Sequence, residues 1–109
     1  MLILTIGGIT LARYSSELIP ENTLEKAVII LKAVAHHDRL QIVNILMKRE
    51  SCVGELKKLL DKTQFHTSDQ LSTLKLAGVL KSRKNGLKVY YSSANNGIKR
   101  IVKSIITEI

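Results

Sequence analysis

The sequence contains one cysteine and no tryptophan among its 109 residues, and only 4% of the residues are aromatic. A lone cysteine excludes an internal disulfide framework and fits a reducing compartment, so we expect a cytoplasmic protein. The apolar run at residues 1–12 is too short to cross a bilayer, and no basic residues precede it as a secretory signal requires. We therefore expect neither membrane insertion nor export.

Catalytic motifs are also absent. The sequence has no glycine-rich phosphate loop, no HExxH motif, no Cys–His dyad at a recognisable spacing and no paired acid–base carboxylates. Patterns of this kind place a nucleophile, a metal ion or a proton donor at a reacting atom. We therefore expect that the protein is not an enzyme and needs no cofactor.

Acidic residues are missing from one long stretch of the chain. Between Gln70 and Thr107 the sequence has eight Lys or Arg residues and no Asp or Glu, whereas residues 1–69 carry nine basic and eight acidic residues. Nearly all of the formal net charge of +8 therefore comes from the last third of the chain. Such asymmetry is typical of a nucleic-acid-binding surface, although a charged hairpin that keeps a sheet edge soluble is an alternative.

Apolar residues at helical spacing predict two helices at the start of one domain, which we place at residues 21–109 after an N-terminal appendage at residues 1–20. The first helix begins near Pro20, where Asn22 caps it and Glu25 completes a capping box. Asp38 is predicted to cap the second helix, whose residues 40–47 are apolar on nearly every side. Such a helix belongs in the centre of a domain.

Two shorter helices follow, joined by a tight polar turn. Ser51 opens the first of them, and Thr63 can cap the second, which runs over residues 64–76. Gly78 has the position and chemistry of a C-cap. The inward-facing residues of the second helix are predicted to be Thr67, Leu71 and Leu74.

A basic hairpin is predicted at residues 80–92. Asn85 and Gly86 supply the two positive-φ residues of a type I′ turn, which is a favoured connection between two short strands. The hairpin brings together the basic residues Lys81, Arg83, Lys84 and Lys88. Two short helices followed by a basic hairpin are the pattern of a winged helix-turn-helix, so we expect a mainly α fold with a small β-hairpin.

The last helix begins at Ser93 or Asn95 and carries one apolar stripe. The stripe has spacings of three and four residues, so it forms a single face. This face could pack on its own domain, but the other helices and the hairpin already supply a core. We therefore expect it to form the interface of a two-fold homodimer, through Ile98, Ile101, Val102, Ile105 and Ile106.

Four segments together resemble the ArsR/SmtB family of bacterial repressors. They are LKAVAHHDRLQIVNIL at residues 31–46, CVGELKKLL at residues 52–60, SDQLSTLKLAGVL at residues 68–80 and RKNGLKVYYS at residues 83–92. The resemblance covers about residues 24–109 in the same order and spacing. It implies an α1–α2–α3–α4–β1–β2–α5 dimer that binds double-stranded DNA at an imperfect palindromic operator.

The same resemblance implies which residues contact DNA. The recognition helix of the family falls on residues 64–76, and its contact residues fall on Gln64, His66, Thr67, Ser68 and Gln70. Hydroxyl, amide and imidazole groups can pair with base edges in the major groove. The basic residues of the hairpin would add contacts to the phosphates.

The metal-sensing motifs of the family are incomplete in this sequence. Glu50–Gly54 reads ESCVG where metal-responsive members have two cysteines, so Cys52 has no thiol partner, and the last helix lacks the His and Asp ligands of the family's other site. We therefore expect no metal site. Cys52 is interpreted as a packing residue, with a redox sensor as the alternative.

Taken together, the sequence predicts a sequence-specific DNA-binding transcriptional regulator, a homodimeric repressor of the ArsR type without an intact metal site. The alternative is a winged-helix module that binds another protein through the same helix and hairpin. The absence of carboxylates between residues 70 and 107 favours DNA, because a protein-binding wing has no general reason to exclude them.

Overall fold

A computed structural model describes residues 5–6, 9–10 and 17–109 of the chain. In the domain that begins at Glu21, the helices are α2 (Glu21–Val34), α3 (His37–Lys48), α4 (Val53–Leu60), α5 (Gln64–Leu76) and α6 (Asn96–Glu108). The strands are β3 (Ser51–Cys52), β4 (Leu80–Asn85) and β5 (Lys88–Ser93), which form an antiparallel sheet in the order β3-β5-β4. The predicted winged helix-turn-helix is confirmed.

The predicted N-terminal appendage lies partly outside the described residues. Strands β1 (Thr5–Ile6) and β2 (Ile9–Thr10) pair with each other in antiparallel register. Helix α2 starts one residue after Pro20 and, contrary to the prediction, has no capping side chain. The side chain of Asn22 accepts a hydrogen bond only from the neighbouring Thr23 amide, at 2.8 Å, because it already lies within the helix.

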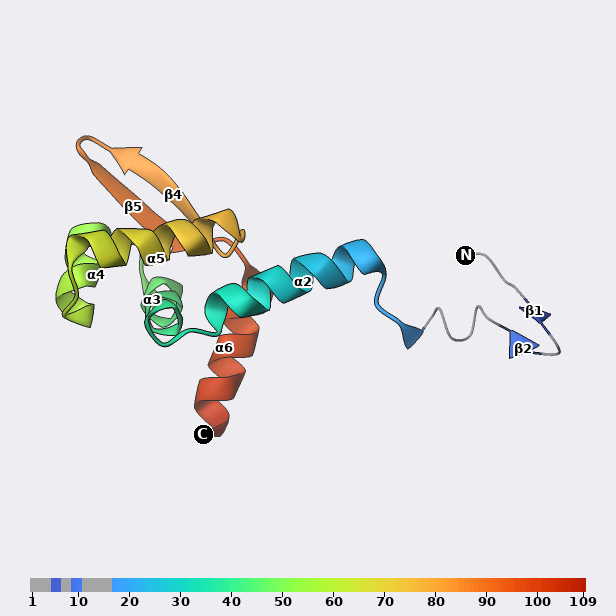
Figure 1. The fold of residues 1–109 in the computed structure, drawn as a ribbon. Helices are drawn as coiled ribbons and strands as arrows, with labels where there is room; N and C mark the ends of the chain where they lie inside the picture. Colours follow the sequence, from blue (N-terminus) through green and yellow to red (C-terminus); the bar gives the residue numbers. More distant parts are fainter. Residues whose placement is uncertain (1–4, 7–8, 11–16) are drawn as a thin grey trace.

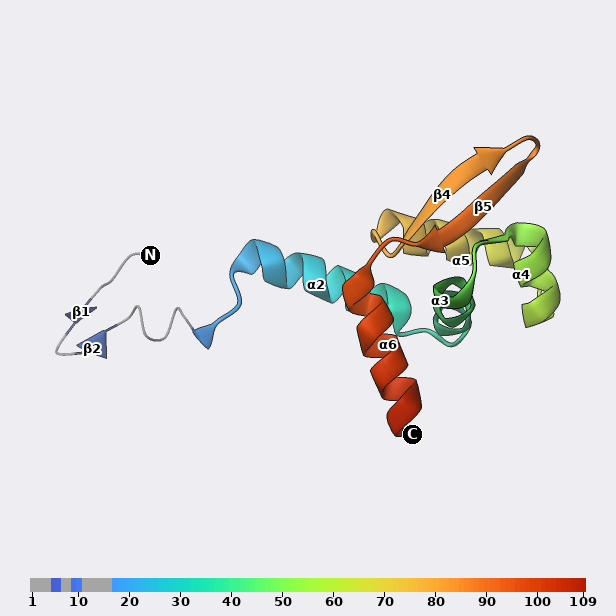
Figure 2. The ribbon, with the colours of Figure 1, turned by 180° about the vertical axis from the view of Figure 1, so that it is seen from behind.

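Helix α3 lies at the centre of the domain and contacts α2, α4, α5 and α6 (Figure 1). This position explains why residues 40–47 are largely apolar. The N-terminal half of α2 and the C-terminal half of α6 extend away from this centre, as both Figure 1 and Figure 2 show. These two halves therefore expose apolar side chains that the domain itself does not cover.

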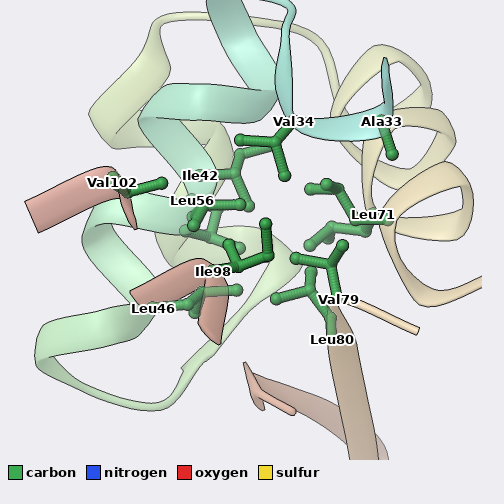
Figure 3. Close-up of a cluster of buried hydrophobic side chains, with 12 residues drawn as sticks. Ala33, Val34, Ile42, Leu46, Leu56, Leu71, Val79, Leu80, Ile98 and Val102 are labelled. Atoms are coloured by element: carbon green, nitrogen blue, oxygen red, sulfur yellow. The ribbon is translucent and has the colours of Figure 1, made fainter. Parts of the chain in front are cut away.

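The core forms where α3, α4, α5 and α6 meet the base of the sheet (Figure 3). Its fully buried side chains include Ile42, Leu56, Leu71, Leu74 and Val79. Burying one such side chain contributes about 1.5–3 kcal/mol to folding. This cluster fixes α5 on the domain and thereby determines which face of α5 remains exposed.

Two members of the predicted dimer interface belong to this core. Ile98 and Val102 are 3% and 2% exposed, and Figure 3 shows both side chains turned toward the cluster. Both side chains also line a hollow between α2 and α6, because the apolar stripe of α6 is wide enough to cover the domain and still expose a second edge. Ile101, Ile105 and Ile106 form that edge and are about half exposed.

Capping side chains begin α5 and α6 as predicted. The Thr63 hydroxyl accepts a hydrogen bond from the His66 amide at 3.1 Å, and Asn95 accepts one from the Ile98 amide at 2.9 Å. Gly78, with a φ of +80°, follows the end of α5 in the left-handed conformation that favours glycine.

The hairpin of β4 and β5 turns one residue later than predicted. Asn85 still pairs with Lys88 as the last residues of the ladder, so Gly86 and Leu87 form the turn. Gly86 has a φ of +66°, and Leu87 has no positive φ. A positive φ at the first central residue alone is the pattern of a type II′ turn, so the predicted type I′ turn was wrong.

Candidate DNA-binding surface

Helices α4 and α5 form a helix-turn-helix whose turn depends on local backbone chemistry. Asp61 ends α4 in the left-handed conformation, with a φ of 54°, and Thr63 then caps α5. Asp and Asn tolerate this conformation better than most residues other than glycine. The turn therefore needs only three residues, 61–63, and holds α5 against α4.

The outer face of α5 begins with side chains that reach into solvent. Gln64, Phe65 and Asp69 are exposed, and Ser68 is half-buried. Phe65 is 85% exposed although it is the only phenylalanine of the sequence. Gln64 and Ser68 therefore lie on the solvent-accessible face of α5.

Thr67, in contrast, is fully buried, as its predicted inward orientation requires. Its hydroxyl donates a hydrogen bond to the Thr63 carbonyl oxygen at 2.9 Å. The assignment of Thr67 as a DNA contact was therefore wrong, because neither its hydroxyl nor its methyl group reaches the helix surface.

A buried carboxylate holds the first turn of α5 to the start of α3. Asp38 is 7% exposed, and its two oxygens accept hydrogen bonds from His66 Nε2 at 2.6 Å and His37 Nδ1 at 2.9 Å. The hydrogen bonds from His37 and His66, together with the charge of Lys62, lower the pKa of Asp38 to about 2. Asp38 is thus ionised at neutral pH and fixes one ring nitrogen of His66.

This arrangement corrects two expectations. Asp38 does not cap α3; His36 is the N-cap residue, and its Nδ1 accepts from the Arg39 amide at 3.5 Å. His66, which was predicted to read a base, instead has Nε2 engaged by Asp38 and only about a third of its side chain exposed. The sequence could not reveal this contact because its two residues lie 28 positions apart.

Arg39 connects α2, α3 and α5. Its Nε donates to the Ala33 carbonyl oxygen at 2.6 Å, and its NH1 group donates to Gln70 Oε1 at 3.0 Å. Gln70 is only 7% exposed. The prediction that Gln70 reads a base is therefore corrected: its amide oxygen orients α5 through Arg39. Arg39 lies within the segment at residues 31–46 that resembles the ArsR/SmtB family.

The hairpin of β4 and β5, which is the wing of the fold, presents three exposed lysines, Lys81, Lys84 and Lys88. A hydrogen bond of 2.7 Å from Lys75 Nζ to Ser82 Oγ joins the wing to the end of α5. Figure 1 shows β4 and β5 extending beside α5. In the β-ladder Lys81 and Lys88 share one face of the hairpin, whereas Lys84 lies on the opposite face.

Arg83 differs from these lysines because it is paired. Its Nε donates to both carboxylate oxygens of Glu50 at 3.0 and 2.9 Å, and its guanidinium carbon lies 5.2 Å from the ring centroid of Tyr90. The ion pair lowers the pKa of Glu50 and raises that of Arg83. The carboxylate of Glu50 therefore offsets much of the positive charge of the Arg83 guanidinium.

Cys52 is buried, with 7% of its surface exposed, and occupies the N-cap position of α4. Its thiol donates to Glu55 Oε1 at 3.3 Å. Among residues 5–6, 9–10 and 17–109, no three His, Cys, Asp or Glu side chains are grouped as a metal ion would require. No helix in this described part of the chain is long and apolar enough to cross a membrane.

Comparison with known proteins places this architecture in a family. The model of the bacterial regulatory proteins of the arsR family matches residues 36–82. The transcriptional activator HlyU of Vibrio cholerae is 35% identical over 83 residues, which are 76% of this chain and 77% of HlyU. A biofilm growth-associated repressor of Agrobacterium fabrum is 33% identical over 78% of this chain and 73% of its own length.

Solved structures agree with the sequence relatives. HlyU from Vibrio cholerae superposes with a TM-score of 0.74 and 34% identity, over 79% of this chain and 94% of HlyU. A homodimeric winged helix-turn-helix DNA-binding domain from Mycobacterium bovis superposes with a TM-score of 0.73 and 26% identity, over 79% of this chain and 80% of that one. The chain belongs to the ArsR family, and it is a DNA-binding transcriptional regulator.

Proposed function

We propose that this protein is a homodimeric repressor that binds a pseudo-palindromic operator on double-stranded DNA in the cytoplasm. Each subunit inserts the N-terminal half of α5 into the major groove and lays its wing along the neighbouring backbone. Two-fold protein symmetry then imposes half-sites about one helical turn, or a small multiple of it, apart.

The observation that carries this proposal is that the exposed polar face of α5 is accompanied by a basic wing without carboxylates, which extends beside this helix. Gln64 and Ser68 remain available for base or phosphate contacts after Thr67 and Gln70 are assigned to the interior. Lys81, Lys84 and Lys88 can each neutralise a phosphate, because no ion pair within residues 17–109 engages them. Arg83 is expected to position the wing through Glu50 and to contribute less to DNA affinity.

Dimerisation supports the two-fold operator. Exposed apolar side chains of α2 and α6 lie around one hollow of about 170 Å³, which Leu31, Ile101 and Ile105 help to line. Surfaces of this kind on small proteins are typically covered by a partner. A second copy of the chain is the occupant we propose, since the related Mycobacterium bovis domain is homodimeric.

The test is a salt titration of DNA binding with a wing variant, Lys81→Gln/Lys84→Gln/Lys88→Gln. Wild type should bind DNA from upstream of its own gene more tightly than a scrambled duplex of equal length. The wing variant should weaken both complexes and reduce the slope of log affinity against log salt by about 5.4, which is 0.9 for each of the six phosphate contacts that the dimer loses.

One result would favour the alternative, a winged-helix module that binds another protein. In that case wild type would bind the upstream and scrambled duplexes equally at physiological salt, and the wing variant would differ little from wild type. If the salt slope changes but wild type does not prefer either duplex, the protein binds DNA without sequence specificity. The proposed operator would then be wrong.

A further inference from the structure

The basic residues of the carboxylate-free stretch divide between two separate places. Four of them lie on the wing and Lys75 lies at the end of α5, whereas Lys99, Arg100 and Lys103 lie on α6. The DNA-binding surface proposed above uses none of the three cations of α6. Their position therefore needs a separate explanation.

These three cations line one side of a groove of about 530 Å³ between α3 and α6. Lys48, at the end of α3, supplies a fourth cation from the opposite side. The remaining lining residues are Asn44, Met47, Ile106 and Thr107, so no carboxylate lines the groove and it includes an apolar part. We call it the α3–α6 groove.

The cations of the α3–α6 groove have no ion-pair partners among residues 17–109. Four like charges around one hollow repel one another, and their field concentrates anions there. By comparison, Arg83 on the wing has a carboxylate partner of its own, Glu50. The charge in the α3–α6 groove thus remains available to a ligand.

Helix α3 contacts both α5 and α6. In Figures 1 and 2, α5 runs above α3, while the C-terminal half of α6 projects below it. DNA that follows α5 and the wing would therefore lie on the other side of α3 from this half of α6. A volume of about 300–1,000 Å³ is typical of small-molecule sites, and the α3–α6 groove falls within that range.

We propose that the α3–α6 groove binds a small organic anion that carries a phosphate group and an apolar chain. Lys48, Lys99, Arg100 and Lys103 hold the phosphate, since a guanidinium and several ammonium groups are the usual partners of phosphate oxygens. Met47 covers part of the apolar chain. This site is independent of the DNA-binding surface.

Calorimetric titration with octyl phosphate, below its micelle range and at physiological salt, tests the proposal. The groove variant is Lys99→Gln/Arg100→Gln/Lys103→Gln, and the wing variant described above is its control because it removes the same three charges elsewhere. The groove variant should lose about tenfold in affinity, which is about 1.4 kcal/mol, because three charge-assisted contacts to the phosphate are removed. The wing variant should bind as wild type does, and neutral octyl glucoside should not bind to any of the three proteins.

Three results would overturn the proposal. Equal losses in both variants would mean non-specific attraction of anions to a basic protein. A salt slope of DNA binding that falls in the groove variant as much as in the wing variant would make the groove a DNA contact. Binding to vesicles of anionic lipid, but not to dispersed octyl phosphate, would assign the groove to a membrane surface. Unchanged circular dichroism and thermal unfolding of the groove variant would confirm that its fold is intact.

Discussion

Replacing Ile101 and Ile105 with alanine should dissociate the dimer without unfolding the subunit. In one subunit these side chains are 45% and 53% exposed, so about half of each remains to be buried by a partner. Full burial of isoleucine contributes about 1.5–3 kcal/mol, which gives about 1 kcal/mol for each half-exposed side chain. Two side chains in each of two subunits then contribute about 4 kcal/mol, or a factor of about 1,000 in the dimer dissociation constant.

Sedimentation equilibrium over a wide concentration range measures this constant. Leu87→Ala is the matched control, because Leu87 is fully exposed at the tip of the wing and far from α6 in the fold. Ile98→Ala offers the converse, since its side chain is buried in the core and its loss should cost about 2–5 kcal/mol of unfolding free energy. A wild-type monomer at tens of micromolar, a typical weak-dimer range, would refute the reasoning, as would a double variant that dissociates as wild type does.

Two further predictions concern contacts inside the subunit, and a third concerns the response to metal ions. Because the pKa of Asp38 falls from 3.8 to about 2 on folding, its contribution to stability is complete above pH 4 and is lost as the pH falls toward 2; denaturant titrations of Asp38→Asn should lack this part of the acid dependence. Arg39→Lys should lower the unfolding free energy by about 1–2 kcal/mol in the same assay, since an ammonium group cannot bond Ala33 and Gln70 together as the guanidinium does. Zinc, cadmium, arsenite and lead should leave DNA affinity unchanged, whereas a metal-induced loss absent from Cys52→Ser would contradict this.

The order of the helices and the wing could be predicted from the sequence because these features depend on local patterns. Thr63 and Asn95 cap helices through hydrogen bonds that span three residues, and Gly78 ends a helix by its own backbone preference. Apolar spacing likewise identified Leu71 and Leu74 as core residues. Each of these signals lies within one turn of helix.

Residues whose roles depend on tertiary contacts could not be assigned in this way. Asp38 has the side chain of an N-cap residue, but its carboxylate instead accepts a hydrogen bond from His66 on another helix. Gln70 was predicted to face DNA from the family resemblance, yet Arg39 holds it at the helix–helix contact. Local sequence gives no information on such pairs, since their partners lie 28 and 31 positions away.

The apolar stripe on α6 is another feature whose role the sequence alone could not determine. Ile101 and Val102 are adjacent in sequence and therefore point about 100° apart around the helix. Val102 enters the core, while Ile101 remains half exposed. A stripe this wide serves two surfaces, and only the packing of α6 against α3 separates them.

Selection of duplexes from a random library by the full-length wild-type chain tests the central claim most directly. Repeated rounds of binding at physiological salt should enrich a two-fold symmetric motif whose half-sites are about one helical turn, or a small multiple of it, apart. Gln64→Ala should bind the enriched motif less selectively, because Gln64 is the exposed amide on the first turn of α5. Enrichment of no motif, or of a single half-site without symmetry, would contradict the account.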